Sequence, residues 1–540
     1  MTIKRLALRP SNLQIWLQDD SQERPFRLIT VQNGLIFFLI VSLTIWAAWQ
    51  RGPWLDEFWT LWLSKHDLPL AATVRDRWLI DVHPPLFVAL NWLAQPLIGD
   101  SVLTRRLVNL IPLCIAALFV IAICRKYPWS KNFTTVFTFL AITSPVVAYN
   151  ITEIRSYFTQ ICCVISLIVC LHSILMMEKV GRIRDHRVLA VSVCILILLC
   201  LNIHYVTAVV ATSIVATAGL GMLVRRQRNW FQLLLTAGVF ASAPLLVWFI
   251  AQNSFLERIS GTFWLIVSLP TAVKILIGLI GKSFCFNLVV IVILIMSTSK
   301  YFSIRGHKRS SLSRNEIEFG HFGANADREI FIIAMISGLA LASLILLLIN
   351  VYRPQIFVAR YLSSIAVTTV AIVAAVIADT VCRHRRIFNI FLLNGALVYS
   401  VTVISHGLDQ GWDGAASFIR SQFNECGSSE ILAVEYKASY FVPNLDRVID
   451  WAYQQEAQRF GFPLKVLPSG SKLDLSRSGR CQSMLWIDHV IWSELPEPAT
   501  AGDIAKKIDI TIPPSFLRQA RLVFSGSGVV IVMGPSPADM

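Results

Sequence analysis

The clearest pattern in the sequence is a series of long apolar blocks separated by shorter polar segments. Blocks of roughly 17–22 apolar residues have the length at which a helix crosses about 30 Å of hydrocarbon. We therefore predict an all-α polytopic membrane region with about eleven transmembrane helices. They cover residues 34–50, 107–124, 133–149, 157–177, 188–205, 207–224, 231–251, 284–299, 330–350, 362–381 and 387–404.

Two other apolar stretches are predicted to lie in the membrane interface rather than to cross the membrane. Pro84–Ile98 is short and contains Pro96, and Trp92 suits the headgroup level. Phe263–Ile280 carries Lys274 near its middle, and a central lysine costs about 2.5–3.5 kcal/mol on insertion. Counting either stretch alone as a span would invert the orientation of every later segment.

Composition and charge narrow the class of protein and its orientation. Hydrophobic residues make up 55% of the 540 residues and charged residues only 15%, whereas soluble proteins carry about a quarter charged residues. The basic residues behind the net charge of +15 gather in alternate loops, which the positive-inside rule places in the cytoplasm together with the N-terminal tail, residues 1–33. The same distribution argues against nucleic-acid binding, which needs a continuous basic face. The first apolar run, Gly34–Trp49, ends in bulky residues and is predicted to be a retained anchor of the bacterial inner membrane.

The last quarter of the chain differs from the transmembrane domain, residues 34–404. In Ser405–Met540 acidic residues outnumber basic ones and the apolar runs are short. We predict a small α/β domain on the periplasmic side. Its expected strands are Ile431–Glu435, Met484–Ile487 and Leu522–Met533, and its expected helices are Gly414–Phe423 and Leu445–Arg459.

The cysteines test that placement. Of the eleven cysteines, only Cys426 and Cys481 fall in the C-terminal domain. In an oxidising compartment two such cysteines favour a disulfide, and two unpaired thiols are the alternative.

The first outer segment, residues 51–106, holds the residues that suggest chemistry. Asp56 and Glu57 follow the first span directly, and a carboxylate there can act as a general base, although acids at a helix start are also simply favourable. Asp81 and His83 stand before Pro84-Pro85, which stiffen the approach to the interfacial helix. An ordinary helix cap with a solvent-exposed histidine is the alternative for this second cluster.

These motifs, in this order, resemble the GT-C glycosyltransferase superfamily. Within it the chain is similar to the protein O-mannosyltransferases and the lipid A aminoarabinose transferases. The resemblance rests on Asp56-Glu57, Asp81–Leu86, Gly99, Arg106, Pro145, Tyr149–Tyr157, Asn202–Tyr205 and Arg360-Tyr361.

The resemblance implies an inverting transfer from a polyprenyl-phosphate sugar, with Asp56 as the catalytic base and Glu57 as its neighbour. A leaving lipid phosphate needs cations or hydrogen-bond donors, and the planar fork of arginine suits phosphate oxygens. Contact with lipid headgroups is the alternative for the arginines, and an ion pair with Arg155 is the alternative for Glu153. The residues implied to bind substrate or lipid phosphate are Asp81, His83, Glu153, Arg155, Tyr157, His204, Tyr205, Arg353, Arg360 and Tyr361.

Departures from the family pattern leave parts of the chemistry open. Phe87-Val88 stand where the O-mannosyltransferases have Gly-Lys, and His83 stands where the aminoarabinose transferases have lysine. A divalent cation held by Asp56, Glu57, Asp81 and His83 is conceivable, but no ligand spacing demands one. The sugar is not indicated, and the hydroxyl acceptor is a glycolipid, a polysaccharide or a protein of the cell envelope.

Two other functions were weighed against the enzyme. A transporter or flippase for a lipid-linked sugar or polysaccharide should show charges inside its spans or inverted repeats, and the sequence shows few of the former and none of the latter. A simple anchor for the C-terminal domain does not need eleven spans.

Overall fold

The computed structural model describes most of the chain, in segments with gaps between them. The described residues are 27–177, 183–260, 267–284, 287–311, 319–352, 357–408, 412–426, 431–434, 444–467, 472, 484–488, 511, 521–525 and 529–533.

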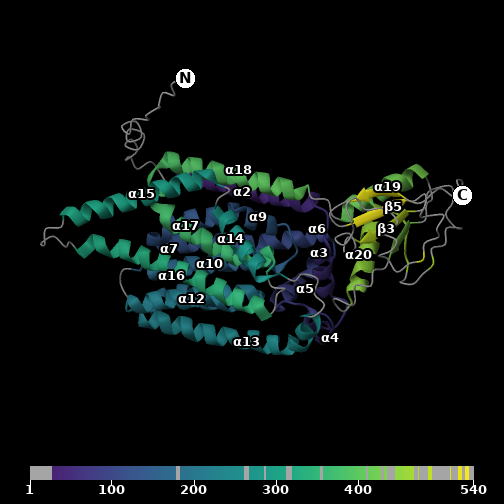
Figure 1. Ribbon diagram of the computed structural model, residues 1–540, viewed down its shortest axis with the longest axis horizontal. Coiled ribbons are helices and arrows are strands. Elements are labelled where there is room, and N and C mark those ends of the chain that lie inside the picture. Colours follow the sequence, from purple (N-terminus) through teal and green to yellow (C-terminus); the bar gives the residue numbers. More distant parts are fainter. Residues whose placement is uncertain are drawn as a thin grey trace, which may run out of the picture.

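The described part consists of a long helical bundle with a small sheet-containing domain at one end (Figure 1). The helices before the C-terminal domain are α2 (Arg27–Gln50), α3 (Leu55–Leu63), α4 (Leu70–Asp76), η1 (Trp78–Ile80), α5 (Leu86–Ile98), α6 (Val102–Arg106), η2 (Leu107–Asn109), α7 (Leu110–Lys126), η3 (Pro128–Ser130), α8 (Lys131–Thr143), α9 (Pro145–Asn150), α10 (Ser156–Leu175), η4 (Ile183–His186), α11 (Arg187–Ile203), α12 (Tyr205–Val224), α13 (Arg228–Ser260), α14 (Leu269–Phe284), α15 (Leu288–Ser311), α16 (Phe319–Tyr352), η5 (Ala359–Leu362), α17 (Ser363–Arg383) and α18 (Arg385–Gly407).

The polytopic all-α membrane architecture is confirmed. Within the described residues, seven helices are long and apolar enough to cross a membrane, and two bent pairs, α2 with α3 and α14 with α15, bring the number to nine. The two remaining predicted spans correspond to shorter helices. One is α11, and the other, predicted as a single helix over 133–149, is split into α8 and α9 because Pro145 begins a new helix after Ser144.

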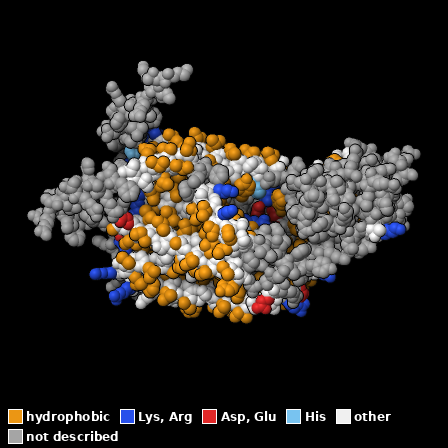
Figure 2. All heavy atoms as spheres, viewed as in Figure 1, with side chains coloured by type: hydrophobic (Ala, Val, Ile, Leu, Met, Phe, Trp, Pro, Cys, Tyr) orange, Lys and Arg blue, Asp and Glu red, His pale blue; other side chains and the backbone are white. Residues whose placement is uncertain are grey.

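The bundle has a central helix and a lipid-facing shell. Nearly every side chain of α10 is buried, whereas α7 turns Ile115 and Leu118 outward and α13 does the same with Phe240. Hydrophobic side chains dominate the bundle surface in the view of Figure 2. The helices approach closely where residues are small, since a Cβ at Gly338 of α16 would lie 3.1 Å from the backbone of α12.

Short helices cover one end of the bundle, where the site lies. Helix α3 makes an angle of 97° with the span part of α2, so it turns off the bundle axis instead of prolonging it. Helix α5 confirms that a helix forms within 84–98, and its place in the interface stays a prediction. It ends at Gly99, whose φ of +75° and ψ of −168° belong to a region that only glycine adopts readily.

The segment 263–280 is partly described. Helix α14 begins at Leu269 and is bent by 85° from α15, and Lys274 lies exposed on its outer side. That it lies in the interface stays a prediction.

The C-terminal part forms an α/β domain, as expected. Its elements are α19 (Trp412–Cys426), β1 (Ile431–Val434), α20 (Leu445–Phe460), β2 (Leu464–Leu467), β3 (Met484–Asp488), β4 (Arg521–Ser525) and β5 (Val529–Met533). The sheet order is β2-β1-β3-β5-β4, with β1 parallel to β2 and β3, and β5 antiparallel to β3 and β4. The single strand predicted over 522–533 was wrong: this run is an antiparallel pair, and β2 was not foreseen.

The domain docks on the back of α3. The Trp412 backbone N–H donates to the Pro53 carbonyl at 3.2 Å. The ring of Phe58 lies 5.5 Å from that of Trp412 and 6.0 Å from that of Trp451. One apolar cluster therefore joins α3 to the C-terminal domain.

Candidate active site around Asp56

The turn between α2 and α3 leads into the first turn of α3, where the carboxylates of Asp56 and Glu57 point to different surroundings. Gly52-Pro53 separates the helices, and Trp54 caps α3 with an extended backbone. The Glu57 side chain accepts from the Trp54 N–H at 3.2 Å, which fixes the first turn. Asp56 and Glu57, one residue apart on a helix, then face different surroundings.

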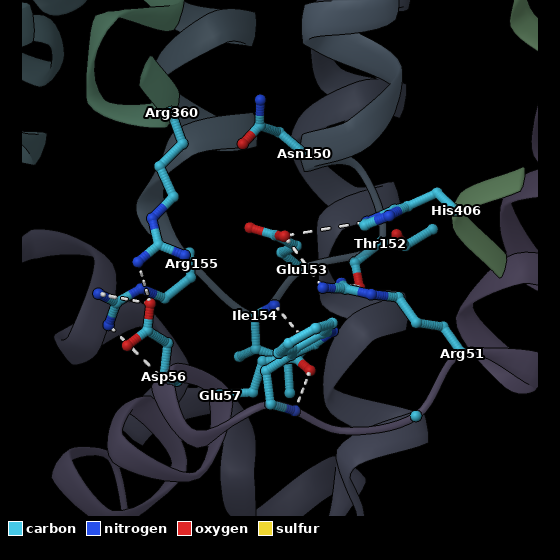
Figure 3. A network of polar contacts seen from close by, with 12 residues as sticks. Arg51, Asp56, Glu57, Asn150, Thr152, Glu153, Ile154, Arg155, Arg360 and His406 are labelled. Atoms are coloured by element: carbon cyan, nitrogen blue, oxygen red, sulfur yellow. Dashed lines mark hydrogen bonds and ion pairs between the residues drawn. The ribbon is translucent and has the colours of Figure 1, made fainter. Parts of the chain in front are cut away.

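Asp56 lies between two arginines that come from distant parts of the chain. Its Oδ2 is 2.5 Å from Arg360 Nη2 and 3.7 Å from Arg155 Nη2. Figure 3 shows both guanidinium groups converging on this carboxylate. Arg155 is also fixed by donating to Thr60 Oγ1 at 3.2 Å.

The Asp56 carboxylate is accessible and ionised. Its side chain is 37% exposed, as is that of Arg360. Burial alone would raise the pKa of Asp56, but the charges of Arg360 and Arg155 outweigh it and hold the pKa below its usual range. The carboxylate is thus available as an acceptor near neutral pH.

Glu57, by contrast, has all its bonding capacity taken up inside the protein. Glu57 is 1% exposed, and its carboxylate accepts hydrogen bonds from Arg106 Nε at 2.9 Å and Arg106 Nη2 at 2.5 Å. The Ile154 N–H adds a bond at 3.1 Å. Arg106 in turn donates to the carbonyls of Ala48 and Gly52. Glu57 therefore secures the turn that carries Asp56.

Asp81 and His83 form a buried pair beside this helix. Asp81 accepts from Trp59 Nε1 and pairs with His83 Nδ1, both at 3.2 Å. Burial by itself would raise the pKa of the Asp81 carboxyl, but His83 and Arg155 hold that pKa below its usual range. The other ring nitrogen of His83 is left for a different partner.

His83 belongs to a cluster of four rings that come from four segments. Its ring centroid is 4.8 Å from that of His204 and 5.8 Å from that of Tyr361. Tyr157 completes the group, 5.6 Å from Tyr361 and 5.9 Å from His204. His204 Nδ1 caps α12 through the Val206 N–H, and its buried Nε2 has no hydrogen-bond partner among the described residues.

This ring cluster adjoins the arginines. The guanidinium carbons of Arg155 and Arg360 lie 5.8 and 5.9 Å from the Tyr157 ring centroid. Aromatic faces and cations together are suited to a sugar phosphate.

Tyr205 and Glu153 have partners that the sequence did not indicate. Tyr205 donates to Gln252 Oε1 at 2.6 Å. Glu153 pairs with Arg51 at 3.1 Å and lies 3.8 Å from His406 Nε2, not in an ion pair with Arg155. In Figure 3 its second oxygen points away from these partners.

Three predicted residues lie outside the described side chains: Arg353, Cys426 and Cys481. The disulfide and the role of Arg353 stay predictions. Within the part of the chain that the structure describes, no group of three or more His, Cys, Asp or Glu residues could hold a metal ion. The four side chains that the sequence offered as metal ligands are therefore not arranged as one set.

Gln252 of α13 contributes to the site and was not predicted from the sequence. Its amide nitrogen donates to the carbonyls of Trp78, Asp81 and His83 at 3.2, 2.9 and 3.2 Å, so it holds the turn that presents His83. A glutamine near the end of an apolar run is the only signal of it, and that signal is weak.

No protein-family model matches the chain, and no curated protein is similar to it in sequence. Among solved structures, the chain is similar to ArnT from Cupriavidus metallidurans bound to undecaprenyl phosphate. The identity is 10%, the TM-score is 0.46, and the match covers 94% of this chain and 99% of that one.

Proposed function

We propose that this multi-pass membrane protein is an inverting glycosyltransferase that moves a monosaccharide from a polyprenyl-phosphate carrier to a hydroxyl acceptor. The observation that carries the proposal is the accessible Asp56 carboxylate held by Arg360 and Arg155 beside a cluster of rings. The resemblance of the sequence motifs to GT-C glycosyltransferases supports it.

In the proposed reaction the acceptor oxygen attacks the anomeric carbon while the bond from that carbon to the phosphate oxygen breaks. The hydroxyl proton passes to Asp56, and the carrier leaves as a polyprenyl phosphate with one more negative charge. Arg155 and Arg360 stabilise that charge. Each arginine that turns to the phosphate weakens its pairing with Asp56, which raises the pKa of this carboxyl and makes it a stronger base.

The other predicted residues take supporting roles in this proposal. The rings of Tyr157 and Tyr361 contact the sugar, and His83 and His204 donate to it or to the phosphate. Glu153 presents its second oxygen to a sugar hydroxyl, while Asp81 and Tyr205 orient their neighbours.

We also propose that the site and the C-terminal domain face the periplasm of a bacterial inner membrane. The support is the distribution of basic residues. Arg125, Arg225 and Arg383 lie at or just after the C-terminal ends of α7, α12 and α17, whose N-terminal ends adjoin the site. The positive-inside rule expects cytoplasm at these basic C-terminal ends. A tag in the loop before α3 that reacts with cytosolic reagents would contradict this orientation.

The function is tested by incubating purified protein with a panel of polyprenyl-phosphate monosaccharides and acceptor fractions from the cell envelope. Mass spectrometry monitors the release of the carrier. We expect at least one lipid donor to release its carrier and a soluble nucleotide sugar to give no transfer. Turnover of the nucleotide sugar would remove the lipid-carrier claim. Movement of intact sugar lipid across vesicles without cleavage would favour the transporter.

A further inference from the structure

A chain of polar side chains lies inside the bundle directly beneath the site. Gln160 of α10 donates through Nε2 to Ser363 Oγ of α17 at 2.8 Å. Its Oε1 accepts from Thr207 Oγ1 of α12. All three side chains are 0% exposed. We call Gln160, Thr207 and Ser363 the Gln160 triad.

Each member of the triad follows a site residue by three positions. Gln160 follows Tyr157 on α10, Thr207 follows His204 at the start of α12, and Ser363 follows Arg360 as η5 leads into α17. Residues three apart on a helix lie on the same face, one turn from each other. Three of the four segments that carry the ring cluster, one of which also carries Arg360, are therefore joined one turn below it.

Stability is a weak explanation for these polar groups. Hydrogen bonds between helices in a membrane contribute little on average, because alternative partners exist in the unfolded reference state. The sequence neighbours Ile161, Val206 and Leu362 belong to the large hydrophobic cluster of the bundle. What a glutamine supplies here, and an apolar residue does not, is a fixed geometry between three helices.

We propose that Gln160 is a positioning residue that sets the spacing of Tyr157, His204 and Arg360 by linking α10, α12 and α17. The inference rests on the proposed function for its kinetic consequences, but the geometry it claims can be measured without turnover. Gln160 touches no substrate and acts through these neighbours.

The chain offers a matched control for the main test. Thr44 of α2 and Tyr399 of α18 form another buried hydrogen bond between spans, at 2.6 Å, which joins no helix that carries the ring cluster. Gln160→Leu and Tyr399→Phe each remove buried polar contacts between helices. Thermal stability in detergent should fall by a similar small amount in both variants.

Only Gln160→Leu should affect the site. We expect kcat/KM to fall about 10- to 100-fold, the effect of displacing a site by about 1 Å, with Tyr399→Phe unchanged. Equal kinetic losses in the two variants, or none in Gln160→Leu, would overturn the proposal.

The two arms of the triad are separated by Ser363→Ala and Thr207→Val. Ser363→Ala should weaken binding of undecaprenyl phosphate several-fold in the wild-type background and have no further effect with Arg360→Lys. Additive losses would mean that Ser363 does not act through Arg360, and the proposal would fail.

A readout independent of turnover separates this inference from the proposed function. Fluorotyrosine at position 361 reports its ring environment by 19F NMR. Its signal should move or broaden in Gln160→Leu and stay in place in Tyr399→Phe. A protein that shows this response but transfers no sugar would retain the positioning role and lose the proposed reaction, and an unmoved signal would refute the positioning role alone.

Discussion

The regions around Asp56 and Glu57 differ although the two residues are adjacent in the sequence. The Asp56 carboxylate pairs with Arg360 and Arg155, and about a third of its side-chain surface remains exposed. Glu57 is enclosed and accepts four hydrogen bonds, two of them from one guanidinium group. A carboxylate whose acceptor positions are all used stabilises the fold, whereas one with free positions can take a proton. The contacts therefore favour a catalytic role for Asp56 and a structural role for Glu57.

The largest expected effect comes from removing the open carboxylate. Asp56→Asn should lower the transfer rate about 10²- to 10⁴-fold, the usual contribution of general base catalysis, because an amide takes up no proton. Expression and thermal stability in detergent should stay close to wild type. The measurement is carrier release with the best lipid donor, and substantial turnover would exclude Asp56 as the base.

Glu57→Gln should reverse that pattern. It leaves the Arg106 charge buried without its partner, and breaking a buried ion pair costs about 3–5 kcal/mol. We expect a marked drop in the melting temperature, while the folded fraction keeps a transfer rate much closer to wild type than that of Asp56→Asn. A stable Glu57→Gln protein without activity would give Glu57 a chemical role.

A third carboxylate, the buried Glu456 of the C-terminal domain, should make the stability of the protein depend on pH. Burial raises the pKa of Glu456 to about 7, with Arg459 opposing the shift and Asp413 adding to it. The folded state therefore binds a proton that the unfolded state releases. Stability should fall as pH rises from about 4.5 to about 7 and then level off, a change of about 3 kcal/mol at most.

Glu456→Gln should abolish that slope and raise stability at pH 8. The stability of each variant is measured between pH 4.5 and 8 from unfolding curves monitored by tryptophan fluorescence. Glu257→Gln, at an exposed position of α13, is the control. An unchanged slope in Glu456→Gln would show that another group titrates.

The smallest expected effect tests whether Arg360, beside the exposed Asp56 carboxylate, binds the phosphate. Arg360→Lys keeps the charge but loses the planar fork, so undecaprenyl phosphate should bind about tenfold more weakly. Arg328→Lys changes an arginine paired at 2.9 Å with Asp379, near the end of α17 that lies away from Arg360, and should leave binding unaltered. Equal affinities in the two variants would remove Arg360 from the phosphate site.

Hydropathy predicted the bundle well because block length and apolar content are local properties of the sequence. The break at Pro145 and the strand pair at 521–533 were missed, since a short turn inside an apolar run leaves little trace. That Asp56 and Arg360 belong to one site was predicted only from the resemblance of the motifs to a known family.

The partners that define the site were beyond sequence reasoning. Arg106 meets Glu57 across 49 positions, Gln252 meets Asp81 across 171, and His406 comes from the last span to Glu153. Such pairs depend on how helices pack, which periodicity does not encode. Open and closed carboxylates were therefore indistinguishable before the fold was known.

The contact of Trp412 with Pro53 and Phe58 has a consequence for how the protein is made. Translation delivers α3 to the membrane more than 300 residues before the tryptophan that covers its apolar side. In the proposed orientation, the nascent chain must wait for its last segment to be exported before this helix is fully packed. The helix that carries Asp56 therefore gains its full apolar packing only late in biosynthesis.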